Sequence, residues 1–244
     1  LRAPIYAVAR DLLPLLQQAG SVAALCQAVA QEMKRLTGFG RCLVYRFDAD
    51  GHGEVLAERL DAGYHSYAGH RFPASDVPAQ ARELYRVNQV RVIPDATYVP
   101  VPLLPAAGAP GPAGLDLTFA TLRSVSPVHL EYMRNMGTAA AMSVSIVVGE
   151  RLWGLISCHD HAPRHLDFQT RVACEHLGRL LSLQIQAQED NADVAQRLAL
   201  HQRVLTLVAS MAESDGTLQK LADPALALQD LTSGAGAALV LNGS

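Results

Sequence analysis

One short segment combines an imidazole, a phenol and two thioethers at helical spacing. Ser126 and Pro127 form a helix-start signal, because a hydroxyl can cap the first turn and proline lacks an N–H that this turn leaves unpaired. The side chains that follow recur every three or four residues and share one face of a short helix; they are His129, Tyr132, Met133 and Met136. We expect this mixed face to meet a flat, conjugated and partly charged ligand.

Two arginines and a second histidine could complete such a site. Arg123 lies just before the helix and Arg91 lies in a short strand-like segment, and each guanidinium could hold a carboxylate. Ser143 lies within one apolar run and His159 ends the next. The alternative for a single histidine is a hydrogen-bonded core residue, and for Arg91 a surface position. Together, these side chains favour a pocket that binds acidic groups of a ligand.

Catalysis and metal binding are less consistent with the sequence. His159, Asp160 and His161, with His165 further on, have loose spacing and no second cluster, so a strand end followed by a polar loop explains them better than a metal site. Cys158 and His159 are neighbours on a strand and point to opposite faces, so they cannot form a nucleophile–base pair. No nucleophile elbow, P-loop or dinucleotide fingerprint is present. We expect a chain that binds and does not catalyse.

Composition limits the classes of partner and compartment. The 244 residues are 50% hydrophobic and 18% charged, with a net charge of −3, and no long basic run suggests a nucleic-acid partner. The 4 cysteines have no CxxC spacing and favour reduced thiols in a cytoplasmic protein. The longest uncharged apolar stretch, residues 138–149, is too short to span a bilayer.

Periodicity and turn signals predict an α+β fold, an antiparallel sheet with helices on its faces. We expect helices over residues 4–18, 21–36, 79–88, 126–137, 167–213 and 217–222. We expect strands over residues 41–48, 54–60, 90–93, 139–148, 152–159 and 237–241, with an irregular loop over residues 94–114.

Two segments have unusual features. Pro73 and Pro78 bracket a turn in which Ser75 and Asp76 take the place of a helix cap. The backbone before Pro78 is biased to an extended form, so its carbonyl groups are available to bond a ligand. The helical pattern over residues 167–213 would be ~70 Å long, and we expect it to connect domains or to pack against a second copy of the chain.

Three motifs give the chain a family resemblance. FPASDVPAQAR (residues 72–82), LRSVSPVHLEYMRNMG (122–137) and LWGLISCHD (152–160) resemble the chromophore-binding GAF domain of bacterial phytochromes over residues 1–188. Residues 189–244 resemble the connecting helix and the N-terminal part of a PHY domain. Both ends look cut from a longer polypeptide, which places an upstream PAS domain and the downstream PHY tongue and output domain outside the sequence.

The resemblance implies a site for biliverdin IXα, a linear tetrapyrrole. Asp76 would offer its backbone carbonyl to the pyrrole N–H groups, His129 would lie over the central rings, and His159 would bond the D-ring carbonyl. The residues that would hold the propionates are Arg91, Arg123 and Ser143. The aromatic shell around the D-ring would be formed by Tyr45, Tyr85, Tyr132 and Phe72. Val77 would be the aliphatic residue beside the rings.

Two positions depart from the family pattern. Val128 stands immediately before His129, where plant-type phytochromes have the attaching cysteine. Ala141 stands where some relatives have a propionate-binding serine. None of the cysteines matches an attachment position, so we expect biliverdin to be bound non-covalently or tethered by an upstream segment.

The resemblance therefore implies a red/far-red photoreceptor. D-ring photoisomerisation would signal through the long helix to an output domain, often a histidine kinase acting on a response regulator. The chain would form a homodimer through the long helix, with no nucleic-acid or membrane partner. Two alternatives remain: a GAF-type sensor of another small molecule, such as a cyclic nucleotide, and a dimerisation module without a bilin.

Overall fold

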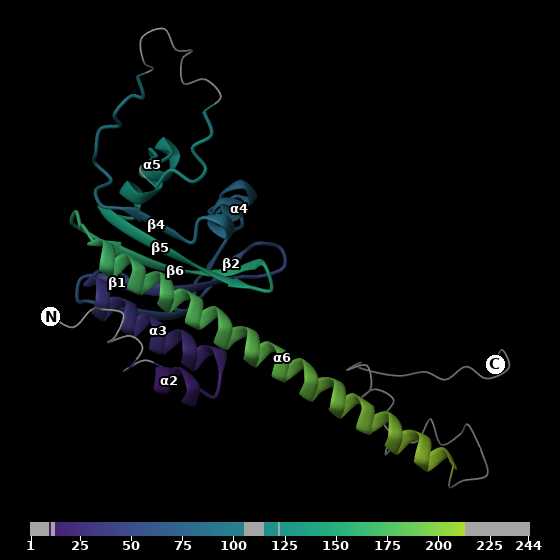
Figure 1. The fold of residues 1–244 in the computed structure, drawn as a ribbon. Coiled ribbons are helices and arrows are strands. Elements are labelled where there is room, and N and C mark those ends of the chain that lie inside the picture. Colours follow the sequence, from purple (N-terminus) through teal and green to yellow (C-terminus); the bar gives the residue numbers. More distant parts are fainter. Residues whose placement is uncertain (1–9, 11–12, 105–114, 122, 213–244) are drawn as a thin grey trace. The chain divides into compact units, whose positions relative to one another are not determined.

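The computed structural model describes residues 10, 13–104, 115–121 and 123–212 (Figure 1). The chain divides into two compact units, Leu1–Gln186 and Ala187–Ser244, and the division falls within the last helix. Every residue discussed as part of the site belongs to the first unit.

The first unit is built on a six-stranded sheet in the order β3-β2-β1-β6-β5-β4. All neighbouring strands are antiparallel, which confirms the predicted α+β plan. The strands are β1 (Arg41–Phe47), β2 (Gly53–Leu60), β3 (Arg71–Phe72), β4 (Val90–Ile93), β5 (Ala140–Val148) and β6 (Arg151–Asp160). The helices are α2 (Leu13–Gln18), α3 (Val22–Thr37), α4 (Ala79–Val87), α5 (Pro127–Asn135) and α6 (Phe168–Ala212).

The two faces of the sheet are covered by different helices (Figure 1). Helices α3 and α6 pack on one face, where Val29, Val44, Ile156 and Leu177 belong to one fully buried apolar cluster. Helices α4 and α5 lie over the other face. That side has two small buried clusters among the described residues, one formed by Ile93, Ala96, Met133 and Ala141 and the other by Leu43, Tyr45 and Val55.

Local signals explain the helix that closes the core. The Ser21 side chain accepts a hydrogen bond from the backbone N–H of Ala24, and Gly38 ends α3 with a left-handed backbone at φ 68°. This is the expected pairing of an N-terminal hydroxyl with a C-terminal glycine. Asp167 similarly accepts from the N–H of Thr170 at the start of α6.

Some expectations need correction. Ser126 precedes α5 but makes no capping hydrogen bond; its backbone has φ −56°, whereas the capping Ser21 has φ −156°. Ser75 and Asp76 are not the cap of α4; the cap position is Pro78, which has no side-chain donor or acceptor. The short strand β3 was not predicted. The expected elements at 217–222 and 237–241, and the loop centre at 105–114, lie outside the described residues.

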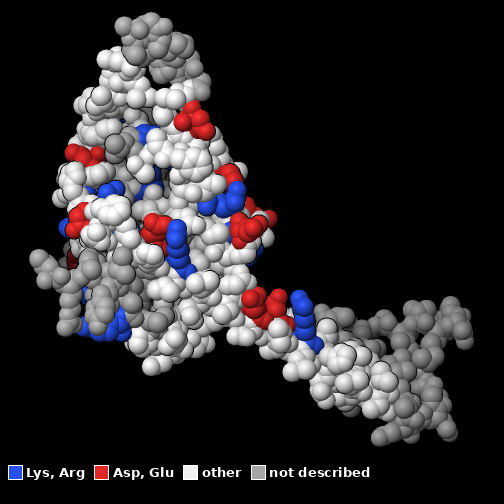
Figure 2. All heavy atoms as spheres, in the orientation of Figure 1, with Lys and Arg blue, Asp and Glu red and all other residues white. Residues whose placement is uncertain are grey.

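Charge is distributed without a dominant sign on the face of the molecule in Figure 2, where basic and acidic side chains are interspersed over the described surface. Among the described helices, none combines the length and apolarity needed to cross a bilayer. The described part of the chain also contains no group of three or more side chains arranged to hold a metal ion.

Candidate ligand-binding site

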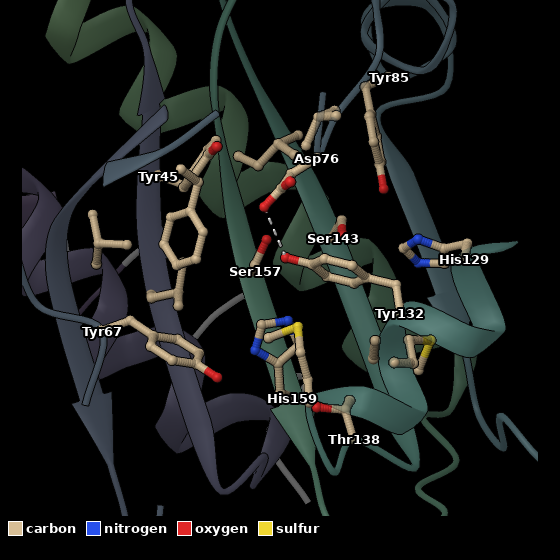
Figure 3. A pocket seen from close by; sticks show the side chains of 18 residues that line it. Tyr45, Tyr67, Asp76, Tyr85, His129, Tyr132, Thr138, Ser143, Ser157 and His159 are labelled. Atoms are coloured by element: carbon tan, nitrogen blue, oxygen red, sulfur yellow. Dashed lines mark hydrogen bonds between the residues drawn. The ribbon is translucent and has the colours of Figure 1, made fainter. Parts of the chain in front are cut away.

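A cavity lies between the sheet and the segments that carry α4 and α5 (Figure 3). Its volume is about 780 Å³, which includes space that is open to solvent. Alternate residues of three strands form its floor, since side chains of one strand face the same side at every second position. These floor residues are Leu43 and Tyr45 of β1, Ala141 and Ser143 of β5, and Leu155, Ser157 and His159 of β6.

Hydrogen bonds with Arg82 and His52 hold the loop that carries Asp76 in place. The Arg82 guanidinium donates to the carbonyl oxygens of Val77 at 2.7 Å and Ala74 at 3.4 Å, and the Ala74 N–H donates to Nδ1 of His52 at 3.1 Å. Arg82 occupies the Val77 carbonyl, whereas the carbonyl of Asp76 accepts no hydrogen bond among the described residues. That oxygen is therefore free to accept from a ligand.

His159 is oriented by a buried arginine. Arg41 and His159 are paired across β1 and β6, and the Arg41 Nε donates to Nδ1 of His159 at 3.2 Å. Arg41 is only 3% exposed; it also donates to the His65 carbonyl at 3.0 Å and lies over the Tyr67 ring at 4.1 Å. Since Nδ1 accepts, a neutral His159 carries its proton on Nε2, where it can donate to a ligand.

Both pocket histidines are neutral at pH 7. Burial, then the charge of Arg41, then that of His129, lower the pKa of His159 to about 3. Burial, followed by the charge of Arg91, also lowers the pKa of His129 below its ordinary value. A cavity with neutral imidazoles can bind polar or cationic groups without repulsion from its own walls.

Tyr132 connects the helix to the Asp76 loop. Its hydroxyl donates to Oδ2 of Asp76 at 3.3 Å, and its ring stacks on that of His129 with centroids 6.3 Å apart. Burial and the Asp76 carboxylate raise the pKa of Tyr132 to about 12. The phenol is therefore protonated and acts as a donor.

An aromatic group forms one end of the cavity. Tyr45 contacts Phe72 at 5.9 Å between centroids, and Tyr67 contacts Phe72 at 5.7 Å. The Tyr45 ring occupies the space that a side chain at Gly53 would need. Glycine at this position of β2 thus lets the Tyr45 ring take its place in the wall.

Arg91 and Arg123 lie close to each other but do not line the cavity. Arg91 donates to the carbonyl oxygen of Arg123 at 3.1 Å, and Arg123 donates to that of Thr118 at 2.9 Å. Burial and then the charge of Arg123 lower the pKa of Arg91. None of the ion pairs among the described residues includes either arginine. Two like charges therefore lie close together without an ion pair to any carboxylate of the described residues.

Nine of the eleven predicted site residues line the one cavity; they are Tyr45, Phe72, Asp76, Val77, Tyr85, His129, Tyr132, Ser143 and His159. Sequence reasoning missed Ser157, Tyr67, Thr138 and Arg41. Ser157 shares the alternation of His159 on β6, so period-two patterning could have identified it. The other three depend on loop positions or on strand register, for which the sequence has no local signal.

Chemically, the arrangement favours binding. It presents neutral N–H donors, a phenol, a carboxylate, an unoccupied backbone carbonyl and a wall of aromatic rings. The four cysteines are buried and none lines the cavity, so no thiolate nucleophile is available there. Such a set suits a planar conjugated molecule that has both N–H and carbonyl groups.

Comparisons with known proteins agree with this fold. The protein-family model for the GAF domain matches residues 21–188. The chain is 42% identical to cyanobacterial phytochrome B of Nostoc sp. over 94% of its own length and 30% of that protein. It is 38% identical to a bacteriophytochrome of Pseudomonas aeruginosa over 96% of its length and 32% of that protein. The chain thus spans about a third of the length of these relatives.

Solved structures give the same result. The photosensory core module of a Stigmatella aurantiaca phytochrome superposes with a TM-score of 0.80 at 44% identity, covering 94% of this chain and 45% of that one. The chromophore-binding domain of a bacteriophytochrome from R. palustris gives a TM-score of 0.70 at 46% identity, covering 76% of this chain and 62% of that one.

Proposed function

Because the chain belongs to the GAF domain family, and because its relatives are phytochromes over most of its length, we propose that it is the bilin-binding part of a red/far-red photoreceptor. The ligand we propose is biliverdin. The observation that supports this most directly is the grouping of nine residues, expected from the phytochrome resemblance, around one cavity.

The polar groups of the cavity fit the centre and one end of a linear tetrapyrrole. The unoccupied Asp76 carbonyl would accept from pyrrole N–H groups, and the neutral His129 would lie beside them. A carbonyl and an imidazole near the nitrogens can stabilise a fully protonated pigment. His159, with its proton on Nε2, would donate to the carbonyl of the terminal ring.

The two arginines fit the acidic arms of the pigment. Arg91 and Arg123 repel each other in the absence of an anion, and a carboxylate would remove that repulsion. Ser143 would add a hydroxyl donor from the cavity floor, while Ala141 has none to offer. Because neither guanidinium lines the cavity, we expect their side chains to turn toward it when the propionates bind.

The remaining wall would control the rotatable ring. Tyr45, Phe72, Tyr85 and Tyr132 would enclose it, and Val77 would contact the rings from the loop side. Bound biliverdin would supply the absorption of red light and a double bond that isomerises. The hydrogen bonds of His159 and of Tyr132 with Asp76 would then be the first protein contacts to change, and such a change must act on an element with two stable arrangements.

The wider assignments are also proposals. We propose that residues 1–188 are the bilin-binding domain and that residues 189–244 are the connecting helix and the N-terminal part of a PHY domain. We infer that α6 takes part in a homodimer and reports the state of the site to an output domain such as a histidine kinase. The pigment would be held without a thioether from Cys26, Cys42, Cys158 or Cys174, since all four are buried away from the cavity.

Addition of biliverdin to the purified chain tests the ligand. We expect a sharp red absorption band that is weakened or shifted in His129→Gln and His159→Gln. His161→Gln is the matched control, because His161 stacks on Tyr64 and does not line the cavity. A free-pigment spectrum in the wild-type chain would reject biliverdin and favour another small ligand or a dimerisation module.

Biliverdin dimethyl ester tests the two arginines separately. The wild-type chain should bind the free acid more tightly than the ester, because esterification removes both carboxylates. Arg91→Gln and Arg123→Gln should reduce this preference, whereas Arg86→Gln, which removes a surface arginine paired with Glu83, should leave it unchanged. Equal affinity for acid and ester in the wild type would contradict the proposal that Arg91 and Arg123 bind the propionates.

A further inference from the structure

The Thr138 side chain has an unusual environment. Its hydroxyl oxygen is buried and has no hydrogen-bond partner, and the residue as a whole is 4% exposed. Among the described residues the other such atom is Nε of Arg171, on α6, and Arg171 does not line the cavity, whereas Thr138 does. Buried polar atoms in folded proteins nearly always have a partner, so a partner from outside the chain is expected at this position.

The backbone fixes where this hydroxyl lies. Gly137 reverses the chain after α5 with a left-handed backbone at φ 63°, and the Thr138 N–H donates to the carbonyl of Met133 at 2.8 Å. The next residue, Ala139, donates to the carbonyl of Asp160, the neighbour of His159, at 2.8 Å. Thr138 is therefore anchored on both sides, and in Figure 3 its hydroxyl lies at the His159 end of the cavity.

The neighbouring chemistry selects the type of group that can bind there. His159 can offer only a donor to the cavity, because Arg41 occupies its Nδ1. Met133 and Met136, which also line the cavity, contribute apolar surface and weakly accepting thioethers. A hydroxyl can donate as well as accept, so one ligand oxygen with two lone pairs could accept from both Thr138 and His159.

We propose that Thr138 is a positioning residue that donates, together with His159, to a single carbonyl oxygen of the ligand. The inference rests on the proposed function, and under that function the oxygen is the terminal-ring carbonyl of biliverdin. A carbonyl held by two donors has less freedom to rotate than one held by a single imidazole. Thr138 would then help to fix the resting orientation of that ring.

Two substitutions separate the hydroxyl from the shape of the side chain. Thr138→Val keeps nearly the same shape and removes the hydroxyl, and Thr138→Ser keeps the hydroxyl and removes a methyl group. We expect Thr138→Val to weaken biliverdin binding by about fivefold, the usual effect of one lost hydrogen bond. The carbonyl stretch of the bound pigment, measured by vibrational difference spectroscopy, should move to higher wavenumber in Thr138→Val and return toward the wild-type value in Thr138→Ser. The ligand-free Thr138→Val chain should be at least as stable as the wild type, because a buried unpaired oxygen is lost.

Each outcome has a distinct meaning. Unchanged affinity and an unchanged carbonyl stretch in Thr138→Val would overturn the inference and leave an internal water as the partner of the hydroxyl. Equal losses in both variants would make Thr138 a packing residue. A shift in the carboxylate bands alone would place the hydroxyl on a propionate and reject the carbonyl assignment. Failure of the wild-type chain to bind biliverdin would reject the proposed function itself, which the comparison of variants does not address.

Discussion

The two faces of the central sheet use the same strands for opposite purposes. On β6, Ile156 and Cys158 point to the α3 and α6 side and are fully buried. Ser157 and His159 alternate with them, are partly exposed and line the cavity. A single strand thus contributes to a closed apolar core on one side and to a polar, partly open site on the other.

The covering helices account for the difference. Helix α3 buries seven residues, whereas α4 buries none and α5 buries only Met133. The core face therefore has the contacts that stabilise the fold, and the site face retains a hole that a ligand can occupy. Polar groups tolerated on the site face, such as Arg41 and His159, are stabilised by hydrogen bonds to one another.

Adjacent substitutions on β6 should show the largest contrast. Ile156→Ala leaves a cavity in the fully buried core and should lower the free energy of unfolding by about 2–5 kcal/mol. Ser157→Ala, one residue further along, should change it by less than about 1 kcal/mol, because this side chain faces the open site. Urea denaturation of the two ligand-free variants measures both values. Similar losses in the two variants would contradict the view that the core face stabilises the fold and the site face does not.

Arg41 provides a test of how the site face satisfies its polar groups. Arg41→Met should lower the free energy of unfolding by about 1–3 kcal/mol, because the His65 carbonyl and Nδ1 of His159 lose their donor. Nitrogen NMR of the His159 ring should also show the loss of a single tautomer. Its pKa should rise from about 3 but stay below the ordinary value, because burial, the larger cause, remains.

Arg46→Met is the matched control for this change. Arg46 lies on the same strand but pairs with Glu54 at the surface, so its removal should affect neither the His159 tautomer nor stability by more than a few tenths of a kcal/mol. An unchanged His159 ring signal in Arg41→Met would show that the imidazole is oriented by something other than this arginine.

Much of the fold was predictable because its signals are local. The predicted strand 90–93 coincides with β4, and the helix expected at 167–213 differs from α6 by one residue at each end. The period-two alternation of β6 correctly placed Cys158 and His159 on opposite faces. Ser21 and Ser126 show the limit of such reasoning, since the same residue type caps one helix and not the other.

The site was predicted less completely because it depends on pairings distant in sequence. The motifs indicated the residues around the cavity, but Arg41 meets His159 only through the register of β1 against β6, across more than a hundred residues. The importance of Thr138 depends on the turn that buries its hydroxyl, and a threonine in a polar turn would look the same in sequence. The motifs also did not indicate that Arg91 and Arg123 would not be among the residues that line the cavity.

The site face should contribute to the pH dependence of stability through His159. The folded pKa of His159, about 3, lies below the value of about 6.5 in an unfolded chain, so between these values the unfolded state binds more protons. Stability should therefore fall as pH falls from about 6.5 toward 3, with a contribution from this residue of at most about 1.4 kcal/mol per pH unit. His159→Gln should make the slope shallower, since glutamine can still accept from Arg41 and does not titrate. Urea denaturation at pH 4–6.5 measures the free energy of unfolding of both chains. An identical pH dependence in the wild type and in His159→Gln would contradict the low folded pKa of His159.

The smallest expected change in the free energy of unfolding comes from removing one hydroxyl on the site face, which we compare with one hydroxyl on the core face. Tyr132 donates to Asp76 at 3.3 Å from a residue that is 36% exposed, so Tyr132→Phe should lower the free energy of unfolding by no more than about 0.5 kcal/mol. Thr37 on the core side is 5% exposed, donates to the Met33 carbonyl at 2.7 Å and accepts from Phe39, so Thr37→Val should cost about 1–3 kcal/mol. Urea denaturation gives both differences, and spectrophotometric titration of Tyr132→Phe should lose one tyrosine with a pKa of about 12. A larger cost for Tyr132→Phe than for Thr37→Val would mean that the contact with Asp76 stabilises the ligand-free fold and that the site face is more rigid than its few buried residues indicate.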